Sequence, residues 1–245
     1  MVDSQPFEPS PPSLVQAVKQ APVTALLIGL SVAVALVSGL GDNLKVLTWL
    51  TVADLHGRDG TLASGVHALV RGEVTIAIGM EAVLRGEVWR LVTPIFIHFG
   101  LLHIMFNMLW MKDLGPLIEA RWSSRTLLAL VLVSAVLSNL VQFLVNWDLK
   151  SGVHYANVLS GGMSGVVYAL LGYVWIRGHS DPTAGIRLRP SIVWMMLGWL
   201  VLCMTGLLGP IGNSAHAVGL LVGAAWGGIA AKLSAGGARP VDRWA

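Results

Sequence analysis

The segment Gly161-Gly162-Met163-Ser164-Gly165 lies inside an apolar run, Ala156–Ile176, that is long enough to cross a membrane. Further along the chain, a second run of this kind, Asn213–Ala231, contains His216 near its start. A serine and a histidine on two spanning segments, each flanked by glycines, predict a nucleophile and a base that meet inside a bilayer. This pair indicates a peptidase that works in the plane of the membrane.

The composition predicts a multi-pass membrane protein with one integral domain. The 245-residue chain is 55% hydrophobic and only 12% charged, whereas soluble domains carry about 25% charged residues. The net charge of +3 is too small to indicate nucleic acid as a partner. The single cysteine, Cys203, excludes an intramolecular disulfide, and we expect it to be a small buried apolar residue.

Six apolar windows approach the length that a membrane-spanning helix needs, about 20 residues. They predict an all-α, polytopic fold with six transmembrane helices and a long first loop. The fifth window is short and contains several glycines, so we expect it to be the most mobile. The windows are Pro22–Leu40, Leu91–Met111 with a continuation toward Glu119, Thr126–Val145, Ala156–Ile176, Ile192–Leu208 and Asn213–Ala231.

Short polar tails are expected before and after the membrane domain in the sequence. Residues 1–20 contain only one basic residue, Lys19, so they lack the basic start of a signal peptide. We expect 1–20 and 232–245 to be cytoplasmic tails and 21–231 to be one six-span catalytic domain. Lys and Arg are concentrated in the termini and the even-numbered loops, and the short odd-numbered loops contain only Lys150. This distribution predicts cytoplasmic termini and a site that opens to the outer side.

The first loop, about Gly41–Arg90, is too long for a turn and too apolar for a disordered linker. Leu62–Val70 and Val74–Leu84 have the pattern of short amphipathic helices that would lie at the membrane interface. A local repeat, Ala68–Val74 against Ala82–Val88, is interpreted as two similar helix ends, each closed by a glycine. We assign no chemistry to it.

The second window contains two side chains that can donate hydrogen bonds. His103 and Asn107 are four residues apart, so they share one face of a helix. One interpretation is a polar contact between helices. The other is an oxyanion hole, in which both donors face a developing negative charge. We expect His98, at the start of this window, to support the first loop and not to take part in the chemistry.

Stripes of small residues predict that the fourth and sixth helices pack closely against each other. Contact between Ser164 and His216 follows if the two residues lie at the same depth. Counted from Ala156, Ser164 is expected about 12 Å down its helix, so the sixth helix would have to start deeper. The small residues are Gly161, Gly165, Ala169 and Gly172 on one helix, and Ala215, Gly219, Gly223 and Gly227 on the other.

The predicted base has no acidic partner. The fourth, fifth and sixth windows contain no Asp or Glu, so a carboxylate that orients His216 is not expected. Tyr168 lies one turn after Ser164 on the same face, and its ring could pack on the imidazole. The sequence therefore predicts a Ser–His dyad with a stacked tyrosine.

Taken in order, these residues resemble the rhomboid family of intramembrane serine proteases, from about Leu91 to the sixth span. The segment 162–165 matches the family's Gly-x-Ser-Gly, and 215–219 matches its Ala-His-x-x-Gly. His98, His103 and Asn107 match its His-x4-His-x3-Asn. Trp89-Arg90 resembles the family's first-loop pair, and 115–119 its Gly-x-x-x-Glu, in which the Glu is structural.

The resemblance implies a six-helix fold with a water-filled cavity that opens outward, where the fifth helix and its loop admit substrate. It implies Ser164 as nucleophile and His216 as base, with His103, Asn107 and the amide of Ser164 as oxyanion donors. It also implies transmembrane protein substrates, membrane lipid as surroundings, no metal or other cofactor, and a bacterial plasma membrane. Substrate-binding or supporting roles are expected for Tyr168, Asn213, His98, Gly162 and Met163.

Two other classes of function fit parts of the sequence. A catalytically inactive rhomboid relative that binds membrane clients usually lacks the serine or the histidine, and both are present here. A transporter could be lined by His103, Asn107 and His216, but transporters often contain inverted repeats of spans, which this sequence does not show. No cysteine or carboxylate cluster suits a metal, and no glycine-rich loop follows a strand as in nucleotide sites.

Overall fold

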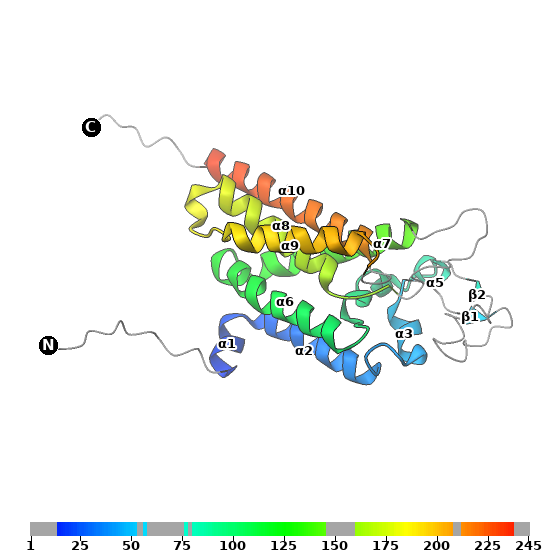
Figure 1. Cartoon of the computed structure of the whole chain (residues 1–245). Coiled ribbons are helices and arrows are strands. Elements are labelled where there is room, and N and C mark those ends of the chain that lie inside the picture. Colours follow the sequence, from blue (N-terminus) through cyan, green and yellow to red (C-terminus); the bar gives the residue numbers. More distant parts are fainter. Residues whose placement is uncertain are drawn as a thin grey trace, which may run out of the picture.

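The computed structural model describes residues 14–52, 56–57, 76–77, 80–145, 160–207 and 212–237. These residues are predominantly α-helical, as predicted, and the long helices run side by side in one bundle (Figure 1). Strand β1, His56–Gly57, pairs antiparallel with β2, Ile76–Ala77. The helices are α1 Leu14–Gln20, α2 Pro22–Val37, α3 Leu44–Leu50, α5 Glu81–Leu84, α6 Leu101–Arg121, α7 Ser124–Val145, α8 Ser164–Ser180, α9 Pro190–Met204 and α10 Asn213–Gly237, with 3-10 turns η1 Val88–Leu91, η2 Thr93–Phe96 and η3 Pro182–Ala184.

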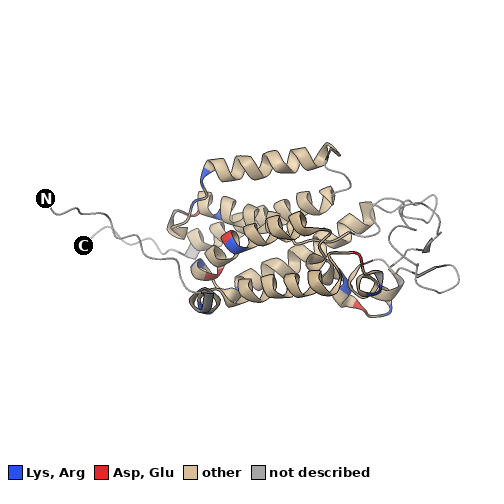
Figure 2. Cartoon of the chain, turned by 60° about the horizontal axis from the view of Figure 1, so that its bottom comes forward, with Lys and Arg blue, Asp and Glu red and all other residues tan. Residues whose placement is uncertain are grey.

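Two of the described helices, α7 and α10, are by themselves long and apolar enough to cross a membrane. Helices α2 and α9 are also apolar but shorter, with 16 and 15 residues. Charged side chains gather toward the ends of the bundle, and long stretches of helix carry none (Figure 2). This distribution suits a bundle surrounded by hydrocarbon, where charge is costly.

Helix α8 lies at the centre of the bundle. Its residues 165–174 are all buried, and it packs against α6, α7 and α10. A Cβ atom added to Gly219 would lie 1.9 Å from the carbonyl oxygen of Gly165, and one added to Gly223 would lie 1.9 Å from that of Ala169. The backbones of α8 and α10 are therefore in direct contact, as their small residues predict.

Two helices begin later than the apolar windows indicate. Helix α6 begins at Leu101 and not at Leu91, because the chain first forms η1 and η2 and then turns at Gly100, whose φ is 95°. Helix α8 begins at Ser164 itself, directly after the turn at Gly162, whose φ is 116°. The expectation that Ser164 lies well down its helix is therefore wrong, and α10 need not start deeper to reach it.

A buried arginine holds separate parts of the first loop together. The buried guanidinium of Arg90 donates hydrogen bonds to the carbonyl oxygens of Thr48 and Thr51, and its Nε lies 2.6 Å from the carboxylate of Glu87. The proposed interfacial helix at 62–70, most of 74–84 and the first copy of the local repeat lie outside the described residues. The second copy, Ala82–Val88, contains all of α5 but its first residue and turns at Gly86, where φ is 107°.

A carboxylate from α6 caps the start of α2, which has no side-chain cap of its own. The two oxygens of Glu119 accept the backbone N–H groups of Val23 at 3.2 Å and Thr24 at 2.7 Å. Gly115 allows this approach, since a Cβ there would lie 2.5 Å from the Thr24 hydroxyl. Glu119 thus satisfies backbone donors that a helix leaves without partners at its N-terminus.

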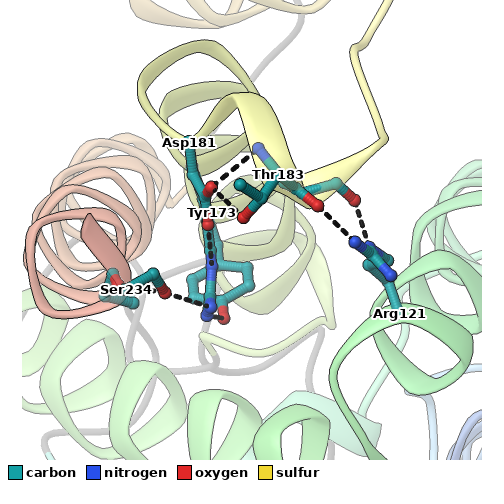
Figure 3. Close-up of polar contacts among 8 residues, drawn as sticks. Arg121, Tyr173, Asp181, Thr183 and Ser234 are labelled. Atoms are coloured by element: carbon teal, nitrogen blue, oxygen red, sulfur yellow. Dashed lines mark hydrogen bonds and ion pairs between the residues drawn. The ribbon is translucent and has the colours of Figure 1, made fainter. Parts of the chain in front are cut away.

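Arg177 connects helices at the opposite end of α8 from Ser164. Its guanidinium lies 4.8 Å from the ring centre of Trp122 and 5.6 Å from that of Tyr173. It also donates hydrogen bonds to the hydroxyls of Tyr173 and Ser234 (Figure 3). One cation thereby joins α8 to α10 and to the turn between α6 and α7.

Candidate active site

The hydroxyl oxygen of Ser164 lies 2.7 Å from Nε2 of His216. Ser164 is the first residue of α8, and His216 lies in the first turn of α10. The glycine contacts between these helices bring their backbones together, so the two first turns meet. Both side chains line a cavity of about 680 Å³, which gives the pair room for a third reacting group.

The ring of His216 is positioned by packing and not by a second hydrogen bond. Its Nδ1 atom is buried and has no hydrogen-bond partner among the described residues. The ring centres of His216 and Tyr168 are 5.1 Å apart, with the planes tilted by 36°. The Tyr168 hydroxyl donates to the carbonyl oxygen of Met196 in α9 at 2.9 Å. Tyr168 therefore contacts both the histidine and the neighbouring helix.

His103 and Asn107 place donors beside the serine, and both line the cavity. The Nδ1 atom of His103 accepts the backbone N–H of Phe99 at 3.2 Å, so in the neutral ring the proton is on Nε2. A Cβ atom added to Gly162 would lie 2.6 Å from this Nε2 and 3.7 Å from the Asn107 side-chain nitrogen. Both donors therefore face the turn that leads into Ser164.

Asn107 also bonds within its own helix. Its side-chain nitrogen donates to the carbonyl oxygen of His103 at 3.1 Å. An amide nitrogen carries two N–H bonds, so a second donor is available toward the cavity.

The other predicted site residues occupy supporting positions. Gly162 lines the cavity. Met163 is fully buried in the apolar core. His98 is also fully buried, with Nδ1 3.0 Å from the Phe96 carbonyl oxygen. The Asn213 side chain does not line the cavity and donates instead to the carbonyl oxygen of Cys203 in α9 at 3.1 Å.

Polar residues of α7 were not identified from the sequence. Ser138, Asn139 and Gln142 line the cavity, and all three are buried. Ser134, Ser138 and Gln142 repeat at every fourth position, so they form a polar stripe along one face of an otherwise apolar helix. This spacing is the signal that could have identified them, because polar groups at membrane depth are costly.

One wall of the cavity is apolar. It is formed by Phe106 of α6 together with Met195, Met196 and Trp199 of α9. The ring centres of Phe106 and Trp199 are 5.9 Å apart. In the part of the chain that is described, no group of three or more His, Cys, Asp or Glu side chains could hold a metal ion. The cavity thus combines an apolar wall with the serine, the histidine and the amide donors.

A family profile described as the Rhomboid domain matches residues 85–233. The chain is also similar to curated bacterial proteins named Rhomboid protease GlpG. The protein from Salmonella paratyphi A is 44% identical over 139 residues, which cover 56% of this chain and 47% of the relative. The protein from Salmonella choleraesuis is 45% identical with the same coverage. The chain therefore spans about half the length of the curated relatives it matches, and the matched profile includes every cavity-lining residue named above.

Proposed function

This chain belongs to the rhomboid family, and from that premise we propose that it is an intramembrane serine endopeptidase that hydrolyses peptide bonds in or near transmembrane segments. The observation that carries the proposal is the 2.7 Å contact between Ser164 Oγ and His216 Nε2 at a cavity. Curated relatives named as rhomboid proteases support the same activity.

Acyl transfer begins when Nε2 of His216 takes the hydroxyl proton of Ser164. The serine oxygen attacks the scissile carbonyl carbon, and the C–N bond of the resulting tetrahedral intermediate breaks. His216 returns the proton to the leaving amine. Water then hydrolyses the acyl-enzyme with His216 again acting as the base. Among the described residues, no carboxylate lines the cavity, so the imidazolium is stabilised by its other neighbours, including the ring of Tyr168.

The negative oxygen of the tetrahedral intermediate receives up to three donors. These are the backbone N–H of Ser164, the Nε2–H of His103 and the free N–H of the Asn107 amide. The hydrogen bond from Phe99 supports the donor role of His103, because it keeps the proton on the nitrogen that faces the turn before Ser164. Loss of one such donor typically lowers kcat about 100- to 1000-fold.

The substrates we propose are spanning segments of other membrane proteins that unwind near their outer ends. A helix hides its peptide bonds, so segments with Gly, Ala or Pro near the cut should be preferred. The resemblance to the family also implies small residues before the cut. The spans would be α2, α6, α7, α8, α9 and α10, with both termini in the cytoplasm and the cavity open to the outer side of a bacterial plasma membrane.

A serine-reactive fluorophosphonate tests the nucleophile. Purified wild-type protein should be labelled, whereas Ser164→Ala should not be, and His216→Ala should be labelled much more slowly. Cleavage of a model spanning segment in liposomes should follow the same order. Equal labelling of wild type and Ser164→Ala would refute the assignment.

Labelling and cleavage, together with a measurement of solute flux, separate the alternative functions. A client-binding relative without activity would not be labelled and would not cleave the segment. A transporter would show solute flux in liposomes that persists in Ser164→Ala. Cleavage that Ser164→Ala abolishes supports the peptidase alone.

A further inference from the structure

The position of His216 depends on the backbone of α10. A histidine that acts as a base is commonly oriented by a hydrogen bond at its second ring nitrogen, and the Nδ1 of His216 has no such partner in the described part of the chain. His216 lies in the first turn of α10, which begins at Asn213. Backbone N–H groups in a first turn have no acceptor within their own helix. This turn therefore needs acceptors from elsewhere.

Gln142 of α7 supplies the acceptor. Its side-chain oxygen Oε1 accepts the backbone N–H of Ala215 at 3.1 Å and also the hydroxyl of Ser214. Only 3% of Gln142 is exposed, so both bonds are largely shielded from bulk water. The residue directly before His216 is thus held by a helix that contributes neither the nucleophile nor the base.

Helix α10 is also in backbone contact with α8. A Cβ atom on Gly219 or Gly223 would lie 1.9 Å from a carbonyl oxygen of α8. A Cβ atom on Gly165 of α8 would in turn lie 3.2 Å from the Ala215 carbonyl oxygen, so α8 also contacts the first turn of α10. At the start of this turn, the side chain of Asn213 donates a hydrogen bond to the carbonyl oxygen of Cys203 in α9.

We propose that Gln142 is a positioning residue, which sets the distance between His216 and Ser164 by capping the first turn of α10 from α7. The inference rests on the proposed function, because it assigns Gln142 a part in the same reaction. Glu119 provides a precedent in this molecule, since it caps the first turn of α2 from α6 in the same way.

Three variants and one control test the proposal. Gln142→Met keeps the length of the side chain and removes the acceptor. Gln142→Glu keeps an acceptor oxygen in either protonation state. Ser214→Ala removes one donor and leaves the N–H of Ala215. The matched control is Ser134→Ala, which removes another buried polar group of α7 that donates to the carbonyl oxygen of Val131 in its own helix and not to α10.

The measurements are kcat and KM for a model spanning segment in liposomes and the rate of fluorophosphonate labelling, all well below the unfolding temperature of every variant. A displaced catalytic group can cost up to about 100-fold in rate. We expect kcat of Gln142→Met to fall roughly 10- to 100-fold while KM stays within about twofold, since the loss is in the transition state. Labelling should slow in parallel, and Gln142→Glu should recover most of the rate.

Each contrary result overturns the inference. These results are wild-type kcat and labelling in Gln142→Met, a Gln142→Glu variant no faster than Gln142→Met, or the same selective loss of kcat in Ser134→Ala. If Gln142→Met does not fold, Ser214→Ala tests the inference instead. Its kcat should fall about threefold or more, and a wild-type kcat in this variant would refute the inference. A wild-type protein that neither cleaves nor labels would refute the proposed function instead.

Discussion

His216 and Ser164 are in hydrogen-bond contact at 2.7 Å although they are 52 positions apart in the sequence. Glycines make this contact possible, because α8 and α10 meet backbone to backbone at Gly219 and Gly223. In a membrane, helices associate largely through such close packing. The contact between Ser164 and His216 is therefore a product of helix packing, and changes at the glycines should affect both stability and the proposed activity.

Substitution of Gly219 tests this dependence. In Gly219→Ala the new Cβ would lie 1.9 Å from the Gly165 carbonyl oxygen, so α8 and α10 must separate. Overpacking of this kind typically costs about 1–3 kcal/mol, sometimes more. We expect a lower Tm in detergent and strongly reduced fluorophosphonate labelling. Gly198→Ala in α9 is the control, because nothing lies within 4 Å of its added Cβ, and its Tm should not fall.

Gly162 should be required for the oxyanion donors as well as for the turn. Its φ is 116°, and an added Cβ would lie 2.6 Å from Nε2 of His103. Gly162→Ala should therefore displace His103 and lower kcat about 100-fold or more, in addition to backbone strain of about 1–3 kcal/mol. Kinetics with a model spanning segment and thermal unfolding measure the two effects separately.

Gly86→Ala is the matched control for Gly162→Ala. Its φ of 107° imposes similar strain, but no atom lies within 4 Å of the added Cβ. It should lose stability and keep most of its kcat. An equal loss of kcat in both variants would show that strain alone, and not the contact with His103, explains the effect.

The helices and the approach of His216 to Ser164 follow from sequence patterns, but the starts of helices and the buried hydrogen bonds do not. Apolar length identified α7 closely, and small residues predicted the contact of α8 with α10. Apolar length could not show that α8 begins at Ser164, because that start depends on the conformation of Gly162. The role of Gln142 was also hidden, since its partners belong to α10 and only tertiary packing brings them together.

The hydroxyl of Tyr168 should hold α9 against the rest of the bundle. Tyr168→Phe keeps the ring beside His216 and removes the 2.9 Å hydrogen bond to the Met196 carbonyl oxygen. We expect a loss of stability of about 1 kcal/mol and faster hydrogen exchange in α9, with labelling of Ser164 largely kept. Tyr168→Leu removes the ring too and should also slow labelling. Unchanged exchange in α9 of Tyr168→Phe would contradict this role.

The carboxylate of Asp181, whose contacts with Thr183 are drawn in Figure 3, should make the stability of the protein depend on pH. One oxygen of this carboxylate accepts two hydrogen bonds from Thr183, one from the side-chain hydroxyl at 2.6 Å and one from the backbone N–H at 2.9 Å. These bonds hold the pKa of Asp181 below its usual value of 3.8. A carboxylate whose pKa is lower in the folded state than in the unfolded state stabilises the fold fully at a pH above its unfolded-state pKa. This stabilisation is lost as the pH falls through its folded-state pKa.

Thermal unfolding between pH 7 and pH 2.5 measures this contribution. Wild-type Tm should fall below about pH 4, and Asp181→Asn should show a smaller fall because it has no proton to bind there. Thr183→Val removes the hydroxyl donor and keeps the backbone N–H, so its fall in Tm at low pH should lie between those of wild type and Asp181→Asn. The hydrogen bond from the Thr183 hydroxyl is the largest cause of the lowered pKa of Asp181. If Tm depends on pH in Thr183→Val as it does in wild type, other groups must lower this pKa. Parallel curves for wild type and Asp181→Asn would exclude Asp181 as a source of the acid sensitivity.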